Sequence, residues 1–417
     1  MSELDRILDQ RGMNSLKWEF TVRNGEPEVW KETDPELGEE QVLSMWVADM
    51  DFRTAEPVIQ ALRERVERGI FGYASKTEQY LDAVQGWMNK RHGFQVEQEW
   101  IVPTVGIVPA LSMMVRKFSK PGEKVLIQRP VYYPFTNAVK NNDRAVLCNA
   151  LKLQNNRYEM DLKDLEQKAA DPDVHLMILC NPHNPVGRVW SFEDLQNVGQ
   201  ICREHQVLLI SDEIHGDLIM PGHQFNCFGL QDQDLLDNVI ISTAPSKTFN
   251  LAGLKTSNLI IPNPRIRQQM KDEIKASGLF GMNPFGIVAT QTAYEHGAPW
   301  LQEAIQYIYG NFEILRDFIR SKLPMLNVLP MEATYLCWID CRELGLTDER
   351  LQELIFEDAR IYVDDGPIFG PEGSGFFRLN LACPRKIVEE ALNRLKNSID
   401  QLSHLFYFVS SNQKNKM

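Results

Sequence analysis

The 417-residue chain lacks long apolar runs, an excess of positive charge and any internal repeat. Its longest apolar stretches, such as residues 176–180 and 207–210, fall far short of the roughly 18 residues that a membrane-spanning helix needs. Lys and Arg total 44 against 57 Asp and Glu, which gives a net charge of −13. The chain therefore lacks the positive electrostatic potential that binds a nucleic-acid backbone. We therefore expect neither a nucleic-acid partner nor a membrane partner.

The chain also lacks the features of secreted and metal-binding proteins. Residues 1–6 are charged and hold no apolar segment before a small-residue cleavage site, so we expect a cytoplasmic location. The seven cysteines are odd in number and scattered, so we expect buried reduced thiols and no metal site. With 43% hydrophobic and 24% charged residues, the composition is that of a globular protein with a large core.

Between about residues 54 and 290, short apolar runs alternate with amphipathic helical stretches. This alternation is typical of a mainly parallel sheet covered by helices, because parallel strands need crossover connections. We therefore predict an α/β fold, in which a large domain with a mainly parallel seven-stranded sheet is joined to a smaller α+β domain. The expected strands of the large domain are residues 101–102, 124–128, 145–149, 175–180, 207–211, 239–242 and 258–261.

The pattern of predicted secondary structure changes after about residue 290, where a long helical region precedes two short strand-like segments and a final helix. The opening residues show no strong periodicity. We therefore divide the chain into an N-terminal arm that is part of the small domain (1–50), a large domain (51–288) and a C-terminal small domain (289–417).

Local signals mark the ends of two helices in the large domain. Ser75 with Glu78, and Ser191 with Asp194, have the spacing of capping boxes at helix starts. Gly93 follows the first of these amphipathic stretches, and we expect it to end that helix.

Three successive expected strands lead into polar residues that can carry chemistry. Asn184 lies in Asn-Pro-His-Asn-Pro-Val-Gly, Asp212 in Ser-Asp-Glu-Ile-His, and Lys247 in Ser-Lys-Thr-Phe-Asn. Each signal alone is common, since such residues are usually a turn, a helix cap and a solvated surface charge. Together they stand at the carboxyl ends of strands, where ligands bind in open α/β sheets.

This set fits pyridoxal phosphate, which needs a lysine for a Schiff base and an acidic partner for its pyridine nitrogen. Asp212 would keep that nitrogen protonated, so that the ring draws electrons from the substrate Cα. Asn184 would donate to the phenolate oxygen of the ring. His215 would either contact the same oxygen or be a structural histidine bonded to the backbone.

Further residues match the rest of the cofactor and an amino-acid substrate. A strand, Gly106 and a Pro-started helix would offer the N–H groups of Ile107 and Val108 to the phosphate, although one glycine before a helix is a common turn. Tyr132 would stack on the ring or simply fill core space. Arg378 lies in an apolar strand, where an unpaired guanidinium is costly, so we expect it to clamp a substrate carboxylate.

The whole chain apart from its C-terminal tail resembles a fold type I pyridoxal-phosphate enzyme of the aminotransferase class I/II superfamily. Within that group it is most similar to the cystathionine β-lyases (C–S lyases) of the MalY/PatB kind. Seven segments carry the resemblance in order along the chain: residues 46–52, 71–73, 181–187, 211–215, 244–254, 296–300 and 375–385.

The resemblance implies a role for each of the principal residues. Lys247 is the Schiff-base lysine and Asp212 the partner of the pyridine nitrogen. Asn184 contacts the phenolate oxygen and the substrate carboxylate, and Tyr132 is the stacking ring. Arg378 is the carboxylate clamp.

The resemblance also implies a homodimer with shared active sites, because Tyr73 matches a tyrosine that reaches the phosphate of the neighbouring subunit. Two positions depart from the related aminotransferases. Lys255 stands where they usually have a phosphate-binding Arg, and Ala244 stands where they often have Ser. We therefore take Ser246 and Lys255 as the phosphate candidates of this segment.

We predict an α,β-elimination on an L-amino acid with sulfur at Cβ, such as cystathionine to homocysteine, pyruvate and ammonia, with Lys247 removing the Cα proton. An aminotransferase would use the same residues, and only residues 46–52 and 244–254 favour the lyase. A non-catalytic binding protein on the same fold is disfavoured because Lys247, Asp212 and Arg378 are all present. A nicotinamide enzyme is a poorer fit, since no Gly-x-Gly-x-x-Gly opens a helix after a first strand.

Overall fold

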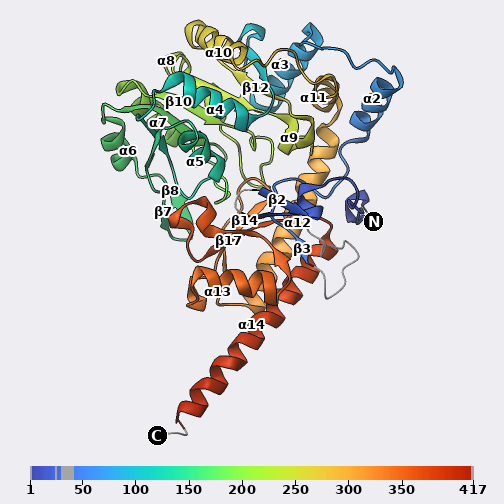
Figure 1. Ribbon diagram of the computed structural model, residues 1–417, viewed down its shortest axis with the longest axis vertical. Helices are drawn as coiled ribbons and strands as arrows, with labels where there is room; N and C mark the ends of the chain where they lie inside the picture. The colour runs from blue at the N-terminus through green and yellow to red at the C-terminus, as the bar shows by residue number, and fades with distance from the viewer. Residues whose placement is uncertain (1, 24–25, 30–41, 415–417) are drawn as a thin grey trace. The chain divides into compact units, whose positions relative to one another are not determined.

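The computed structural model describes residues 2–23, 26–29 and 42–414 and divides the chain into two compact units (Figure 1). Unit 1 comprises Met1–Phe52, Tyr307–Leu329 and Tyr335–Met417, and unit 2 comprises Arg53–Gln306 and Pro330–Thr334. The short last segment therefore belongs to unit 2, although the chain on either side of it belongs to unit 1.

A seven-stranded sheet forms the centre of unit 2. Its strands in spatial order are β4 (Ile101–Thr104), β12 (Ser257–Ile260), β11 (Val239–Thr243), β10 (Leu208–Asp212), β9 (Val174–Cys180), β5 (Lys124–Ile127) and β6 (Ala145–Cys148). β12 runs antiparallel to both of its neighbours, and the other pairs are parallel. All seven expected strands are present, and the prediction of a mainly parallel sheet is confirmed. Their nearly continuous apolar sequences are typical of strands covered on both faces.

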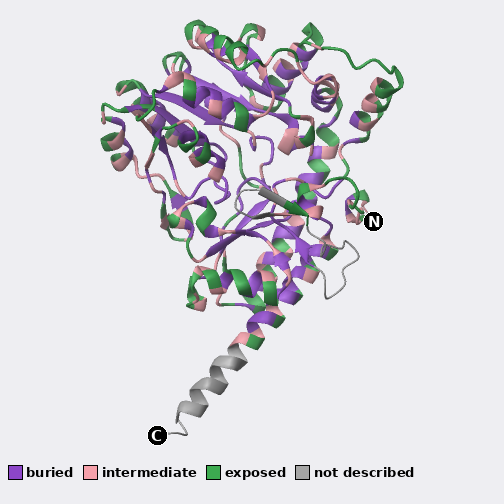
Figure 2. Cartoon of the chain, viewed as in Figure 1, coloured by how far each residue is buried: buried purple, intermediate pink, exposed green. Residues whose placement is uncertain are grey.

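Helices cover this sheet, as the alternating pattern predicts, and Figure 2 shows its strands as largely buried. The helices of unit 2 before the last strand are α2 (Glu56–Glu67), α3 (Glu78–His92), α4 (Ile107–Phe118), α5 (Tyr133–Lys140), α6 (Leu162–Ala169), α7 (Phe192–Glu204), α8 (Gln233–Leu236) and α9 (Pro245–Thr248). After the last strand come α10 (Pro264–Ala276) and α11 (Pro284–His296). A small hairpin is formed by β7 (Lys152–Gln154) and β8 (Arg157–Glu159).

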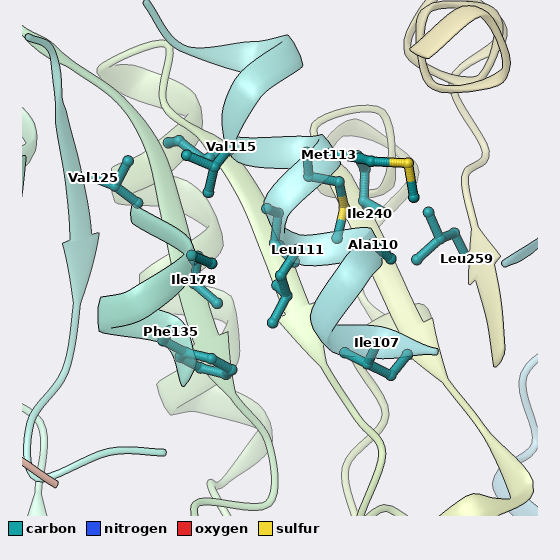
Figure 3. Packing of buried hydrophobic residues seen from close by; sticks show 14 of the residues in the cluster. Ile107, Ala110, Leu111, Met113, Val115, Val125, Phe135, Ile178, Ile240 and Leu259 are labelled. Carbon is teal, nitrogen blue, oxygen red and sulfur yellow. The ribbon is translucent and has the colours of Figure 1, made fainter. Parts of the chain in front are cut away.

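The main apolar cluster of unit 2 includes residues of α4, α5 and the sheet (Figure 3). Leu111 of α4, Phe135 of α5 and Ile178 of β9 have no exposed surface. The buried residues of α4 recur at the spacing of one helix face, which presents that face to the sheet. This packing holds α4 in place and with it the position of its N-terminus.

Helix α3 begins differently from the sequence prediction. Thr77 is the N-cap, and its hydroxyl accepts a first-turn backbone N–H at 3.3 Å. The predicted capping box of Ser75 and Glu78 is therefore wrong, because Glu78 is the first helical residue and not the third. Gly93 ends the helix in the left-handed conformation at φ 71°, as predicted.

The expected capping box of α7 is confirmed, and the expected burial of the cysteines holds for six of the seven. At the start of α7, the Ser191 hydroxyl accepts the Asp194 N–H and the Asp194 carboxylate accepts the Ser191 N–H, both at 3.0 Å. All seven cysteines are outside disulfides, and all but the half-buried Cys148 are buried.

Unit 1 contains a four-stranded antiparallel sheet with helices, which matches the expected α+β texture. In spatial order its strands are β13 (Asn327–Val328), β14 (Leu336–Asp340), β17 (Phe376–Asn380) and β16 (Asp364–Asp365). The helices include α13 (Asp348–Glu353), α14 (Arg385–Lys414) and the end of α12 (Ala298–Lys322), which starts in unit 2. The N-terminal part adds α1 (Leu16–Glu19), β1 (Phe20–Arg23), β2 (Glu26–Val29) and β3 (Leu43–Ser44), of which β3 pairs with β15 (Ile361–Tyr362).

A buried ion pair joins α1 to the end of the N-terminal segment of unit 1. Lys17 Nζ lies 2.8 Å from an Asp51 carboxylate oxygen, and Trp18 Nε1 donates to the other oxygen at 2.7 Å. Lys17 and Asp51 are both buried, and Lys17 Nζ also lies 3.8 Å from Asp49 Oδ1, so the buried ammonium has two carboxylate partners. In the part of the chain that the structure describes, no helix has both the length and the apolar character needed to cross a bilayer.

Leu111→Ala should lower the free energy of unfolding by about 2–5 kcal/mol, because it leaves a cavity between α4 and the sheet. Val108→Ala on the same helix is the control. The Val108 side chain is 41% exposed, so we expect a change within about 0.5 kcal/mol. Urea denaturation followed by circular dichroism measures both variants, and equal losses would contradict the placement of Leu111 in the core.

Candidate active site

The candidate residues of unit 2 follow the carboxyl ends of five strands. β4 leads through Gly106 into α4, β5 leads to Tyr132, β9 leads to Asn184, β10 ends in Asp212, and β11 leads to Lys247. These five strands run in the same direction, since β4 and β11 are each antiparallel to β12 and the others pair in parallel. Their carboxyl ends therefore meet at one edge of the sheet, the usual place for ligands in such folds.

Asp212 is the last residue of β10 and pairs in register with Cys180 of β9 and Ser242 of β11. Its carboxyl is buried and accepts the Ile214 N–H at 3.3 Å. Burial raises the pKa of Asp212 to about 7, against the opposing effects of the Ile214 N–H and of the positive charge on Lys247. A carboxyl in this state is strongly stabilised in its ionised form by a cation placed against it.

Lys247 lies in the short helix α9, just after β11. Pro245 at the first helical position pre-sets the turn, and its carbonyl accepts the Phe249 N–H at 2.9 Å. Lys247 is half-buried, and its charge acts on the carboxyl of Asp212. The structure thus places the predicted lysine and the predicted acid after the carboxyl ends of the neighbouring strands β11 and β10.

Asn184 and Tyr132 are joined through their backbones. The buried Asn184 donates its N–H to Cys180 Sγ at 3.5 Å, and its carbonyl accepts the Tyr132 N–H at 3.1 Å. Tyr132 directly precedes α5, and its half-buried ring lies 6.0 Å from the Phe135 ring in a T-shaped arrangement. The core therefore uses only part of the Tyr132 ring.

His215 lies in the turn that follows β10, three residues after Asp212. It is buried, and its carbonyl accepts the Leu218 N–H at 2.9 Å. At the next position, Gly216, an added Cβ would lie 2.8 Å from the Phe225 ring. A side chain at this position would therefore require the Phe225 ring to move.

The connection from β4 to α4 has the features of an anion-binding turn. Gly106 adopts φ 118°, a conformation that favours glycine, and its N–H donates to Ser257 Oγ at 3.1 Å. The same Ser257 oxygen is hydrogen-bonded to Thr104 Oγ1 at 2.6 Å. Ile107 and Val108 then open the helix, where first-turn N–H groups have no intrahelical acceptor and the helix dipole is positive. Such a terminus suits a phosphate.

Ser246 and Lys255 both precede Ser257 in the chain. Ser246 is half-buried and precedes Lys247 in α9. Lys255 is exposed and adopts a left-handed conformation at φ 50°, two residues before Ser257. Lys255 is thus close in sequence to Ser257, the residue whose hydroxyl accepts the Gly106 N–H.

Arg378 belongs to unit 1, where it lies in the middle of β17 and is 3% exposed. Its guanidinium forms an ion pair with Asp364 of β16, donates to the Trp46 carbonyl at 3.0 Å and lies 4.9 Å from the Phe369 ring centre. This buried guanidinium is therefore paired within unit 1, because Asp364 supplies a counter-charge. Its role as a carboxylate clamp stays a prediction.

Tyr73 lies on the surface of unit 2 and is 93% exposed. Its ring lies 5.5 Å from that of Phe280, which is 76% exposed. Ile70 and Phe71, next to Tyr73 in the sequence, are also exposed. Four large apolar side chains are thus left to solvent in this part of unit 2.

Three residues of these arrangements are absent from the sequence predictions. Ser257 holds the Gly106 turn and Asp364 pairs with Arg378, but both are distant in sequence from their partners and no local pattern marks them. Asp217 accepts a hydrogen bond from the residue after Lys247. The run Asp-Glu-Ile-His-Gly-Asp, with three carboxylates within one turn, is the signal that could have found it.

The donor set of unit 2 fits pyridoxal phosphate part by part. The Lys247 amine suits the aldehyde, and the buried carboxyl of Asp212 suits the pyridine N–H. The N-terminus of α4 suits the phosphate, and the half-buried ring of Tyr132 suits stacking. Within the described residues, no group of three or more His, Cys, Asp and Glu side chains has the arrangement of a metal site.

Comparison with known proteins agrees with this geometry. A family model described as aminotransferase class I and II matches residues 40–395. The cystathionine beta-lyase PatB of Bacillus subtilis (strain 168) is 43% identical over 395 residues, which cover 95% of this chain and 99% of that protein. The protein MalY of Escherichia coli (strain K12) is 31% identical over 404 residues, which cover 96% of this chain and 99% of that protein.

Solved structures give the same result. Cystalysin from Treponema denticola, whose crystal structure contains a pyridoxal 5'-phosphate cofactor, matches with a TM-score of 0.89 at 37% identity. The match covers 96% of this chain and 99% of the cystalysin chain. The resemblance and the fold type expected from the sequence are confirmed.

The raised pKa of Asp212 predicts a pH dependence of stability in the cofactor-free protein. The unfolded chain ionises this carboxyl at its ordinary value of 3.8, whereas the folded protein keeps the proton up to about 7. The folded state therefore binds more protons in this interval, and stability is lost as the pH rises from about 4 to about 7.

Asp212→Asn removes this contribution, because an amide does not titrate. We expect the Tm of the variant relative to the wild type to rise between about pH 4 and pH 7 and then to level off. Differential scanning calorimetry of both proteins measures the difference. A difference that stays constant with pH would mean that Asp212 ionises normally in the folded protein.

Proposed function

The chain belongs to the aminotransferase class I and II family, and we propose that it is a pyridoxal-phosphate-dependent carbon–sulfur lyase acting on sulfur-containing L-amino acids. The observation that carries this proposal is the pairing of β10, which ends in the buried Asp212, with β11, which leads to Lys247, in a chain 43% identical to a cystathionine beta-lyase. Cystathionine is the representative substrate, with homocysteine, pyruvate and ammonia as products.

Bound pyridoxal phosphate supplies an aldehyde that reacts with amines and a ring that accepts electrons from the substrate Cα. Asp212 holds a proton on the ring nitrogen, since the buried carboxyl needs an adjacent cation to be ionised near neutral pH. Asn184 and His215, from neighbouring strand ends, donate hydrogen bonds to the phenolate oxygen.

Lys247 would hold the aldehyde of the cofactor, and its amine would accept the Cα proton of the substrate at Nζ. The electron pair of the broken Cα–H bond forms the Cα–Cβ double bond, and the thiolate departs with the electrons of the Cβ–S bond. The aminoacrylate that is released reacts with water to give pyruvate and ammonia.

Other residues bind and orient the reactants. Tyr132 stacks against the ring with the part of its surface that the core leaves open. The N–H groups of Ile107 and Val108 hold the phosphate, with Ser246 and Lys255 as further ligands. The hydrogen bond from Gly106 to Ser257 supports this role, because it fixes the turn that opens α4.

Arg378 binds the substrate α-carboxylate. A guanidinium matches a carboxylate as a planar fork, and the gain from such a contact is greatest where the fork is already fixed. The ion pair with Asp364 and the hydrogen bond to the Trp46 carbonyl support this role, because they hold the guanidinium in one orientation within unit 1.

The protein acts as a homodimer in which Tyr73 of one protomer reaches the phosphate site of the other. The exposed group formed by Ile70, Phe71, Tyr73 and Phe280 supports this arrangement. A second copy of the chain would remove these apolar side chains from water.

Lys247→Ala should lower pyruvate release from cystathionine by about 10²- to 10⁴-fold, because the base for the Cα proton is lost. Lys275→Ala is the matched control, since this exposed lysine lies at the end of α10 and should leave turnover unchanged. In addition, borohydride reduction of the loaded wild type should fix the cofactor on the peptide that contains Lys247, as read by mass spectrometry. Labelling of another lysine would refute the assignment.

The same wild-type preparation separates a lyase from an aminotransferase. A lyase releases pyruvate continuously from cystathionine alone, whereas an aminotransferase needs a keto-acid acceptor and converts that acceptor to an amino acid. Amino-group transfer to the keto acid without pyruvate release would contradict the proposed function.

Tyr73→Phe keeps the ring and removes the hydroxyl. We expect the variant to sediment as a dimer like the wild type, with an affinity for pyridoxal phosphate about 10-fold weaker, because one hydrogen bond to a charged group is lost. Titration of the cofactor-free protein measures the affinity, with Tyr309→Phe, a half-buried tyrosine of α12, as the control. A monomeric wild type with the same affinity as the variant would contradict the shared site.

A further inference from the structure

Asp217 lies at the end of the turn after β10 and is 6% exposed, and four side chains converge on its carboxylate. Trp87 Nε1 donates to both oxygens, at 3.0 and 3.1 Å. His92 Nε2 lies 2.9 Å from Oδ1, Arg91 Nε lies 3.8 Å from Oδ1, and the Thr248 hydroxyl donates to Oδ2 at 2.7 Å. The carboxylate thus connects the end of α3 to α9.

The charge of this carboxylate is stabilised despite its burial. Burial raises the pKa of Asp217, but the hydrogen bonds and charges of His92, Thr248 and Arg91 outweigh that effect and leave the pKa below its ordinary value. Tyr294 of α11 and Cys227 are further titratable neighbours, and burial raises the pKa of both, with a contribution from the charge of Asp217. Asp217 is therefore ionised at neutral pH and only accepts hydrogen bonds.

Thr248 links this carboxylate to the chemistry, because it directly follows Lys247. It has no exposed surface, and Asp217 accepts its hydroxyl. The next residue, Phe249, packs its ring 5.5 Å from Trp87 and 6.2 Å from Tyr294. The backbone on the C-terminal side of Lys247 is thus fixed by one hydrogen bond and by packed aromatic rings.

Asp212 and Asp217 stand at the two ends of the same turn, and each contacts the segment that carries Lys247. Asp212 pairs in register with Ser242 of β11, on the N-terminal side of the lysine. Asp217 holds Thr248 on the C-terminal side. The turn from Asp212 to Asp217 is therefore connected to the lysine segment on both its N-terminal and its C-terminal side, and so fixes the position of that segment relative to Asp212.

We propose that Asp217 is a positioning residue for the lyase reaction, which through Thr248 holds the Lys247 amine in the orientation that proton removal requires. This inference rests on the proposed function and adds to it a group that does not touch the reactants. It predicts that loss of the hydrogen bond between Thr248 and Asp217 slows the chemical step, while the fold and the substrate-binding residues stay unchanged.

Thr248→Val tests this directly, because it keeps the shape of the side chain and removes the hydroxyl. We expect kcat for pyruvate release to fall about 10- to 100-fold, the range for a misplaced catalytic group. KM should stay within about twofold, since ground-state binding is unchanged. Thr248→Ser restores the hydroxyl and should restore kcat. Asp217→Asn, in which one carboxylate oxygen becomes an NH2 facing donors, should change kcat in the same direction as Thr248→Val.

Thr290→Val is the matched control for stability. Thr290 is also buried, and its hydroxyl donates to the Gly286 carbonyl within α11 at 2.7 Å. We expect this variant to lower Tm as Thr248→Val does and to keep the kcat of the wild type. If both variants lose kcat in proportion to Tm, Thr248 has only a structural role and the inference is overturned.

Hydrogen exchange in the cofactor-free protein gives a second readout that does not depend on activity. Backbone amides of residues 246–251 should exchange several-fold faster in Thr248→Val than in Thr248→Ser. A wild type that takes up no cofactor or releases no pyruvate would overturn the proposed function. The exchange data would in that case still test whether the Thr248 hydroxyl fixes the backbone next to Lys247. An active wild type with equal exchange and equal kcat in the two Thr248 variants would overturn the inference alone.

Discussion

The candidate site depends on the register between three parallel strands. In the paired strands β9, β10 and β11, the residues Cys180, Asp212 and Ser242 lie side by side. The loops that follow these strands therefore start next to one another at the same edge of the sheet. The pairing continues past the strand ends, where the Asn181 N–H donates to the Asp212 carbonyl at 2.9 Å. A slip of β10 by one residue would turn Asp212 to the opposite face and put Glu213 in its place. The backbone thus decides which carboxyl faces the lysine.

The three carboxyl groups of this turn show how packing separates the roles of similar residues. Burial raises the pKa of Asp212 to about 7, which leaves it ready for a cation. Glu213 faces Ser211 and the Phe228 N–H, and burial raises its pKa although both donate to it. Asp217 is kept ionised by its donors from α3 and α9. Environment and not residue type therefore decides which of these carboxyls holds a proton near neutral pH and which is ionised.

Much of the fold was predictable because the relevant signals are local. Apolar runs of strand length gave all seven strands, and Gly93 gave the end of α3. The error at Ser75 arose because several hydroxyl residues can cap a helix, and the backbone at Thr77 decides between them. The spatial order of the strands and the antiparallel direction of β12 were not predicted, because they depend on contacts between distant segments.

The sequence by itself determined the residue types of the site and their places after successive strands, because chemistry and strand pattern are both properties of short segments. It also determined the family, through motifs that run the length of the chain. Only the tertiary structure decided the partners of the buried polar groups, such as Ser257 for Gly106, Asp364 for Arg378 and Thr248 for Asp217. These partners are far apart in the chain and meet only once the strands are in register and the helices are packed, since a buried charge must find its partner within the fold.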